Sequence, residues 1–417
     1  MSGNVFVDVT QLHGWQGKLT GIPRVMSELS SRFSTSEGYK LVVWQHKSGF
    51  VELSYDDLLA DRQKVQQTVV QPAGTKSIRK TILDTVPGAR KSIHYARQLK
   101  QRRLRAEERV FQDSRLVTSH DTLVILWGAW ESQPYIDYVA GLHESGTKLV
   151  QVVYDMLPLV TPQFSGHSTE WLMNYASTLY PLCSLLLSIS EHTSKDTRAW
   201  LETRGLRVPE IRTFRLGDDF KVAKPKRTSD PSFVAAKLKG SDYLLAVGTV
   251  EARKNHALLY YSYKLAAQRK LDLPSLVIVG RRGWLTDDIY TLMTTDPEVK
   301  EKFVFLQNAG DEELAWLYKN CLFSVYPSFY EGWGLPVAES IAHGVPCLAS
   351  NTSSIPEIGG DLIGYFSPYS TDECLDALCS LLDTKKLAAA RQKVRQYRPM
   401  SWEQTYKTFD DHLRSVR

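Results

Sequence analysis

Two glutamates separated by seven residues stand out in the segment FYEGWGLPVAES at 329–340. Glu331 precedes a glycine turn, and Glu339 lies one to two turns into the helix predicted after it. Free backbone N–H groups at such a helix start bind sugar hydroxyls or phosphates. Both carboxylates can then project along one side of a bound molecule, although Glu339 is equally explained as a helix-surface residue. The turn and helix start comprise Gly332, Trp333, Gly334 and Leu335.

A pair of cations, Arg253 and Lys254, follows an apolar run that ends in Gly248 and Thr249, within LLAVGTVEARKN. An anionic leaving group gains negative charge in the transition state, and fixed cations in a desolvated cleft stabilise that charge. We therefore interpret the two side chains as leaving-group stabilisers, with a solvated basic turn as the alternative. No D-x-D ends a predicted strand, so we expect no metal, since the cations supply the positive charge.

Three further loops and one strand end supply candidate ligand contacts. The segment GRRGW contains Gly280 and Arg281, and Asn308 follows the apolar run FVFL. Asp155 ends the run VVYD, where capping of a turn is the alternative role. Gly21 lies in a glycine-rich loop before a predicted helix, so backbone amides of that loop can face a ligand. Arg281 is equally explained as a surface cation.

These residues follow strand-length apolar runs that alternate with helix-length amphipathic segments, which is the pattern of a parallel α/β sheet. Ligands of such sheets bind beyond the carboxyl ends of the strands. The fold class predicted is therefore α/β, with two Rossmann-like doubly wound domains facing a cleft. The predicted strands are 4–9, 40–44, 121–126, 148–154, 184–189, 211–216, 243–247, 275–279, 304–306, 322–326 and 345–350.

A chain of 417 residues exceeds what one hydrophobic core usually supports. The segment 221–240 is rich in Lys, Pro, Ser and Asp and has the composition of a linker. We expect an N-terminal domain at 1–220, with a basic insertion at about 72–112, and a C-terminal domain at 241–398. A final helix at 399–417, opened by a capping box at Ser401, is expected to pack back on the N-terminal domain.

Charge is concentrated in one segment of the chain. The net charge is +5, yet 76–109 alone contains eleven Lys or Arg against three acids. Recurring apolar residues there suit a basic amphipathic helix on an anionic membrane surface, and a solvated surface helix pair is the alternative. Interleaved aromatic residues are nearly absent from this segment, which argues against nucleic acid as a partner.

The composition also bears on cellular location. Five cysteines without C-x-x-C spacing indicate a reducing compartment and no structural metal. No apolar run approaches the roughly 20 residues of a membrane span. The N-terminal residues lead directly into a predicted strand rather than a signal peptide. We expect a cytoplasmic protein, or one that is peripheral on the inner face of the cytoplasmic membrane.

The segment 329–340, together with the following HGVPCLASNTSSIPEIGGD, resembles the E-x7-E region of glycosyltransferase family 4. Members of that family are retaining enzymes with the glycosyltransferase B fold. The resemblance extends from about 150 to 403 and implies that Glu331 holds the transferred sugar and Glu339 the ribose. Lys254 falls at the family's lysine position, and we assign the family's arginine role to Arg253. The chain departs from the family where Thr249 replaces the arginine of G-R-L.

The same resemblance implies roles for the remaining candidates. The loops with Gly280, Arg281 and Asn308 would flank the base, and Asp155 would contact the sugar or acceptor. The loop with Gly21 would lie beside the donor phosphates. Glu357 in SSIPEIGG resembles a position near the donor, or else caps the following turn.

The G-T-x-E-x-R-K-N pattern resembles a mannosyl- and rhamnosyl-transferring branch of bacterial surface-polysaccharide assembly, which commonly uses GDP-mannose. We therefore predict a retaining, metal-independent hexosyltransferase that moves mannose from GDP-mannose to a glycan or lipid-linked glycan, with no cofactor beyond this co-substrate. Alternatives are transfer of rhamnose or glucose from a dTDP- or UDP-sugar, an epimerase or phosphorylase, and a noncatalytic membrane-associated scaffold with the same fold.

Overall fold

The computed structural model describes residues 3–15, 17, 19, 21–60, 116–165, 168–219, 238, 240–307 and 309–416. Within these, the chain divides into two compact units, one ending at Gln151 and the other spanning Val152–Val416. The basic insertion expected at about 72–112 lies outside the described residues, as do most of the expected linker and the candidate Asn308. The domain boundaries expected at 220 and 240 therefore stay predictions.

The first sheet has seven strands in the order β3-β2-β1-β4-β5-β6-β7. β1 pairs parallel to β2 and β4, β4 to β5 and β6 to β7, whereas β3 pairs antiparallel to β2 at the sheet edge. The strands are β1 Val5–Asp8, β2 Tyr39–Gln45, β3 Gly49–Glu52, β4 Thr122–Ile125, β5 Lys148–Val153, β6 Leu185–Ser188 and β7 Glu210–Thr213. Among the strands of this sheet, only β3 was not predicted, because this short edge strand has two exposed residues and lacks a continuous apolar run.

The second sheet has six strands in the order β10-β9-β8-β11-β12-β13, and all neighbouring strands in it are parallel. The strands are β8 Tyr243–Val247, β9 Ser275–Val279, β10 Phe303–Leu306, β11 Ser324–Tyr326, β12 Cys347–Ser350 and β13 Gly364–Phe366. Near-continuous apolar runs form these strands because helices cover both faces of the sheet. The two parallel sheets confirm the predicted α/β class with Rossmann-like domains.

Helices associated with the first sheet include α2, whose buried face consists of Val25, Met26, Leu29 and Phe33 at helical spacing. Gly21 precedes α2 with φ 59° and ψ −134°, a backbone conformation that favours glycine. The helices are α1 Thr10–His13, α2 Ile22–Phe33, α6 Gln133–Glu144, α7 Leu157–Val160, α8 Ser168–Leu179 and α9 Glu191–Thr203, with 3-10 turns at Pro162–Phe164 and Tyr180–Leu182.

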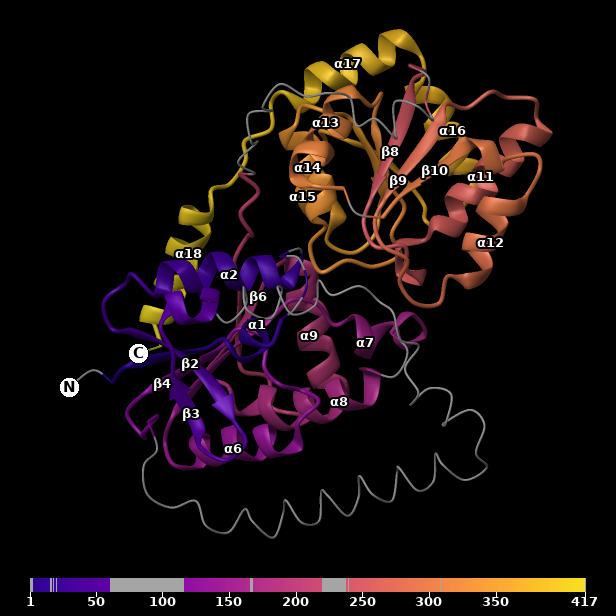
Figure 1. Cartoon of the computed structure of the whole chain (residues 1–417). Coiled ribbons are helices and arrows are strands. Elements are labelled where there is room, and N and C mark those ends of the chain that lie inside the picture. The colour runs from indigo at the N-terminus through magenta and orange to yellow at the C-terminus, as the bar shows by residue number, and fades with distance from the viewer. Residues whose placement is uncertain are drawn as a thin grey trace, which may run out of the picture. The chain divides into compact units, whose positions relative to one another are not determined.

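Two cores lie on the two faces of the second sheet. One packs residues of α11, α12 and α16 on the sheet, and the other packs α13 on its opposite face. Figure 1 shows α11, α12 and α16 on one side of β8, β9 and β10, and α13 on the other. The helices are α11 His256–Gln268, α12 Asp287–Thr295, α13 Asp311–Asn320, α14 Leu335–Ala342, α15 Ile355–Gly359, α16 Thr371–Leu381, α17 Thr384–Val394 and α18 Trp402–Arg414, with 3-10 turns at Ala252–Lys254 and Lys300–Lys302.

The last helix, α18, packs on the end of the first sheet. Ser401 accepts a hydrogen bond from the Gln404 N–H, which forms the expected capping box. Phe409 packs edge-on against Phe214, with ring centroids 4.9 Å apart, directly after β7. Among the described residues, no helix is long and apolar enough to cross a membrane.

Candidate active site

The carboxyl ends of β8 and β11 carry the two strongest sequence candidates. These strands are neighbours in the second sheet. The loop after β8 leads into the 3-10 turn Ala252–Lys254, and the loop after β11 contains Glu331. Lys254 and Glu331 are both buried, with 8% and 6% of their surface exposed. The topology therefore brings together residues that lie 77 positions apart in the sequence, which accords with ligand binding at this edge.

Glu331 forms ion pairs with both neighbouring cations. Its Oε2 lies 2.6 Å from Arg253 Nη1, and its Oε1 lies 2.6 Å from Lys254 Nζ. The Tyr326 hydroxyl donates a hydrogen bond of 2.8 Å to Oε1. Arg253 Nε lies 2.6 Å from Oε1 of Glu251, which is also buried. Each of the two cations is therefore fixed by a carboxylate in a water-poor environment.

The charge state of this cluster follows from its burial and its pairing. Burial by itself raises the pKa of a carboxyl group, but the charges of Arg253 and Lys254 outweigh it at Glu331 and lower its pKa to about 2. Burial raises the pKa of Glu251, although Arg253 opposes this. Burial lowers the pKa of the Lys254 ammonium, while the Glu331 charge raises it. Glu331 is consequently ionised at neutral pH.

Two serines hold the backbone of the turn that carries Glu331. The Ser354 hydroxyl donates to the carbonyls of Glu331 and Trp333, at 2.9 and 2.6 Å. The Ser353 hydroxyl accepts from the Glu331 N–H at 3.0 Å. Gly334 then starts α14 at φ 122°, a conformation that favours glycine over other residues. The carboxylate is thus attached to a backbone that the next loop fixes.

Gly332 packs where no larger residue fits. A Cβ atom at this position would lie 2.0 Å from the Tyr154 carbonyl oxygen and 2.9 Å from Cβ of Asp155. Asp155 is half-buried, and its Oδ1 accepts from the Leu157 N–H at 3.1 Å, so it caps the first turn of α7. Burial raises the pKa of Asp155, and the nearby Arg253 charge lowers it. The close approach places Asp155 beside the Glu331 turn.

We expect Gly332→Ala to lower the free energy of unfolding by roughly 1–3 kcal/mol, because two backbone segments must separate to admit a methyl group. Urea unfolding followed by circular dichroism measures this change. Gly141, inside α6, provides the control, since a Cβ there meets nothing within 4 Å. Gly141→Ala should leave stability unchanged or raise it by about 0.5–1 kcal/mol. Equal effects of the two substitutions would contradict the packing described here.

The loops after β8 and β9 also touch through glycines. A Cβ on Gly280 would lie 1.9 Å from the Gly248 carbonyl oxygen, so neither loop admits a larger residue there without moving. Gly248 has φ 144°, and Lys254 Cε lies 3.6 Å from its ideal Cβ position. The side chains of Thr249 and Arg281 are exposed beside this contact. Of these candidates, Gly248 lies beside Lys254, and Gly280 contacts Gly248 from the loop after β9.

Glu339 lies farther along α14 and is partly buried. The Tyr318 hydroxyl donates to its Oε2 at 3.3 Å. Leu335 lies at the start of the same helix, also partly buried. Gly21 belongs to the other compact unit, and the roles inferred for these three residues and for Asn308 stay predictions.

Glu357 contacts the start of α9 rather than the turn that follows it in the sequence. Its two carboxylate oxygens accept from the backbone N–H groups of Glu191 and His192, each at 2.8 Å. These groups form the first turn of α9, whose N-cap is Ser190. The carboxylate therefore accepts hydrogen bonds from the N-terminus of a helix that lies 165 residues away in the sequence. A helix N-terminus favours a negatively charged partner.

Sequence reasoning missed several residues of the cluster. Tyr326 lies within a buried strand, and its hydrogen bonds to Glu331 and Lys254 have no signature in the sequence. Glu251 and Ser354 were likewise not selected, because Glu and Ser in loops are common. The G-T-x-E-x-R-K-N spacing contains Glu251 and was the one signal that could have identified it.

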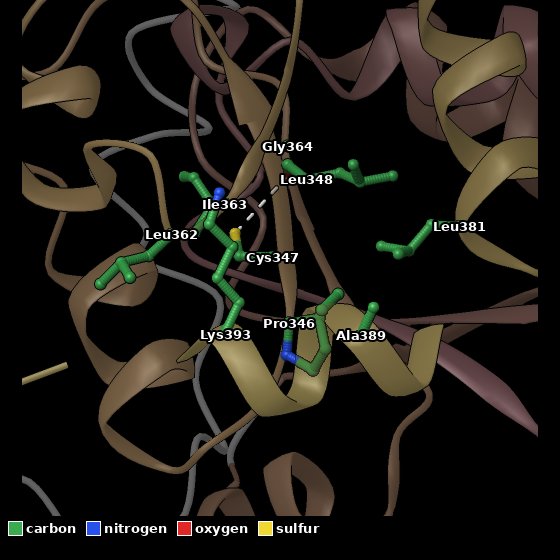
Figure 2. A pocket seen from close by; sticks show the side chains of 10 residues that line it. Pro346, Cys347, Leu348, Leu362, Ile363, Gly364, Leu381, Ala389 and Lys393 are labelled. Atoms are coloured by element: carbon green, nitrogen blue, oxygen red, sulfur yellow. Dashed lines mark hydrogen bonds between the residues drawn. The ribbon is translucent and has the colours of Figure 1, made fainter. Parts of the chain in front are cut away.

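A separate cavity of about 270 Å³ lies elsewhere in the second sheet, between the β12 and β13 strands and α17. Figure 2 shows its mainly apolar lining. The lining residues are Pro346, Cys347, Leu348, Leu362, Ile363, Gly364, Leu381, Ala389, Ala390 and Lys393. Burial raises the pKa of the Cys347 thiol to about 12, so this cysteine is unreactive at neutral pH. The cavity includes no member of the charged cluster.

Comparison with known proteins identifies similarities over parts of the chain. Residues 230–397 match the family described as glycosyl transferases group 1. The serotype-specific mannosyltransferase WbdA of Escherichia coli is 28% identical over 244 residues, which cover 56% of this chain and 29% of WbdA. O-antigen chain mannosyltransferase B of Escherichia coli is 36% identical over 171 residues, which cover 40% of this chain and 44% of that protein. The matches thus span less than half the length of these curated relatives.

Among solved structures, HepE of Anabaena in complex with UDP and glucose superposes with a TM-score of 0.61 at 14% identity. The match covers 99% of this chain and all of HepE. At this identity the likeness establishes the fold.

Proposed function

We propose that the chain is a nucleotide-sugar-dependent hexosyltransferase of the glycosyl transferases group 1 family, whose model matches residues 230–397. The observation that carries the proposal is the buried Glu331 carboxylate held between Arg253 and Lys254 at the carboxyl ends of adjacent strands. Buried, pre-oriented charges of this kind stabilise charge that develops during a reaction.

In the proposed reaction the donor diphosphate binds against Arg253 and Lys254. As the bond from the sugar to the diphosphate breaks, negative charge grows on the departing oxygen, and the two cations stabilise it more strongly than they stabilise the intact donor. Glu331 orients both cations and is placed to contact the transferred sugar, and Glu339 binds the ribose. Asp155, beside the Glu331 turn, contacts the sugar or the acceptor.

The proposal includes retention of configuration and independence of metal ions. The acceptor hydroxyl attacks the face that the diphosphate leaves, and a donor phosphate oxygen takes its proton. Two cations at the diphosphate supply the positive charge that a divalent ion provides in other enzymes. Among the described residues, no group of three or more His, Cys, Asp or Glu is arranged to hold a metal.

We propose GDP-mannose as the donor and a glycan or lipid-linked glycan of a bacterial surface polysaccharide, such as an O-antigen, as the acceptor. Support comes from the mannosyltransferase names of the relatives from Escherichia coli. A UDP-sugar is the second candidate, since HepE was solved with UDP and glucose. A cytoplasmic location, with attachment to the inner membrane face through 76–109, completes the proposal.

A panel of GDP-, UDP- and dTDP-sugars, each assayed with and without chelator, tests this function. We expect GDP-mannose to bind and to release its nucleotide slowly without acceptor, at a rate that the chelator leaves unchanged. Loss of turnover with chelator would remove metal independence. If no donor binds and Glu339→Ala behaves identically to the wild type, the noncatalytic scaffold replaces the transferase.

A further inference from the structure

Tyr369 is the most exposed of the large hydrophobic side chains described, with 77% of its surface accessible. It follows the end of β13 at Phe366, on the edge of the sheet where ligands bind. Its ring lies 5.2 Å from that of Phe329, which in turn stacks on Phe164 at 5.0 Å with the planes 9° apart. We call Phe164, Phe329 and Tyr369 the aromatic row.

The aromatic row is attached to the turn that carries the cations. The Phe329 N–H donates to the Arg253 carbonyl at 2.8 Å. Asn255 Nδ2 donates to the Pro368 carbonyl at 2.9 Å, directly before Tyr369. Asn255 is buried and holds φ 55°, a left-handed conformation that asparagine adopts more readily than most residues. These two hydrogen bonds join the backbone at Phe329 and at Pro368, next to Tyr369, to the turn that carries the cations.

Strand order separates this ring from the loops expected to bind the base. Those loops follow β9 and β10, at one end of the order β10-β9-β8-β11-β12-β13. The charged cluster follows β8 and β11 in the middle, and Tyr369 follows β13 at the opposite end. A donor that runs from the base loops to the cluster thus ends with its sugar between the cations and the aromatic row. The molecule that approaches from beyond the sugar is the acceptor.

We propose that the aromatic row, with Tyr369 at its exposed end, is a subsite for a pyranose ring of the acceptor; this inference rests on the proposed transferase function. A pyranose has a face of C–H groups with partial positive charge, which packs on the negative face of an aromatic ring. Its hydroxyl groups remain at the rim, where the tyrosine hydroxyl and water bond them. Ligand sites for such molecules combine aromatic surfaces with few polar groups.

Steady-state kinetics with GDP-mannose and a short α-linked mannose oligosaccharide test the subsite. We expect Tyr369→Ala to raise the KM for the oligosaccharide roughly tenfold more than the KM for the donor. Tyr369→Phe and Tyr369→Trp, which keep an aromatic face, should restore a KM within about threefold of the wild type. Tyr261, which is 52% exposed on α11, provides the matched control, and Tyr261→Ala should leave both KM values unchanged.

A second measurement separates this inference from the function on which it rests. Oligosaccharide binding to the full chain, titrated by calorimetry without donor, should weaken roughly tenfold in Tyr369→Ala. Unchanged oligosaccharide binding and KM in this variant, or a rise confined to the donor KM, would overturn the subsite while leaving the transferase intact. Absence of nucleotide release from every donor by the wild type would instead overturn the transferase.

Discussion

Replacing Lys254 with methionine should lower kcat for sugar transfer by about 10²–10³, while the donor KM changes by less than about threefold. Methionine preserves most of the buried side-chain volume and removes the charge. The loss falls on kcat because the ammonium stabilises the departing diphosphate more than the bound donor. Glu331 keeps its ion pair with Arg253 and its hydrogen bond from Tyr326, so the site remains folded.

Two comparisons sharpen this prediction. Lys264 forms ion pairs with Asp296 and Glu298 on the surface, and Lys264→Met should leave kcat unchanged. Glu339→Ala should mainly raise the donor KM, because Glu339 is proposed to bind the ribose in the ground state and the transition state alike. A fall in kcat for Glu339→Ala, together with a rise in KM alone for Lys254→Met, would reverse the proposed roles.

How far the sequence predicts this site depends on the kind of contact. Strands such as β8 and β9 were predicted with the bounds the structure shows, because both faces are covered and the apolar run has no interruptions. The proximity of Arg253, Lys254 and Glu331 was also predictable, since residues after neighbouring parallel strands meet at one edge. β13, with only three residues, was too short for its apolar pattern to be recognised.

Contacts made by buried hydroxyl groups and by glycines were not predictable in the same way. Tyr326 donates a hydrogen bond to Glu331 in addition to its ion pairs, yet a tyrosine in a buried strand is most often a packing residue. Gly332 and Gly280 were selected as turn residues, whereas the structure shows that each is required by a carbonyl oxygen within about 2 Å of its missing Cβ. Such contacts depend on how loops from different strands meet, which the local sequence does not specify.

Glu331 gives the second large effect, which combines stability with activity. Glu331→Ala leaves Lys254 buried without its carboxylate partner and deprives Arg253 of one of its two carboxylate partners. Removal of one member of a buried ion pair costs about 3–5 kcal/mol, and we expect a loss near 3 kcal/mol because Glu251 and Tyr326 still bind the cations. Sugar transfer should fall at least 10²-fold, since the carboxylate that fixes both cations together is lost. Urea unfolding and initial rates measure the two effects.

The pH dependence of the same ion pair distinguishes an electrostatic role of Glu331 from a role in packing. The pKa of Glu331 is lowered to about 2 in the folded chain, against 4.5 for the free side chain, so its contribution to stability is complete above about pH 4.5. That contribution is lost progressively as pH falls from 4.5 toward 2, when the folded carboxylate takes up a proton. The stability difference between wild type and Glu331→Gln should therefore shrink over this range.

Comparing wild type with Glu331→Gln at pH 6, 4.5 and 3.5 cancels the contribution of carboxylates distant from this site. The substitution also removes the Glu331 charge that raises the pKa of Asp155 and Glu251, so the comparison reports the charge of Glu331 together with its effect on these two neighbours. The difference in unfolding free energy should be largest at pH 6 and smaller at pH 3.5. Glu298, an exposed partner of Lys264, serves as the control, and Glu298→Gln should change stability by less than about 0.5 kcal/mol throughout. A difference for Glu331→Gln that is constant with pH would mean that the carboxylate stabilises the site by packing rather than by its charge, and the electrostatic account of the cluster would have to be abandoned.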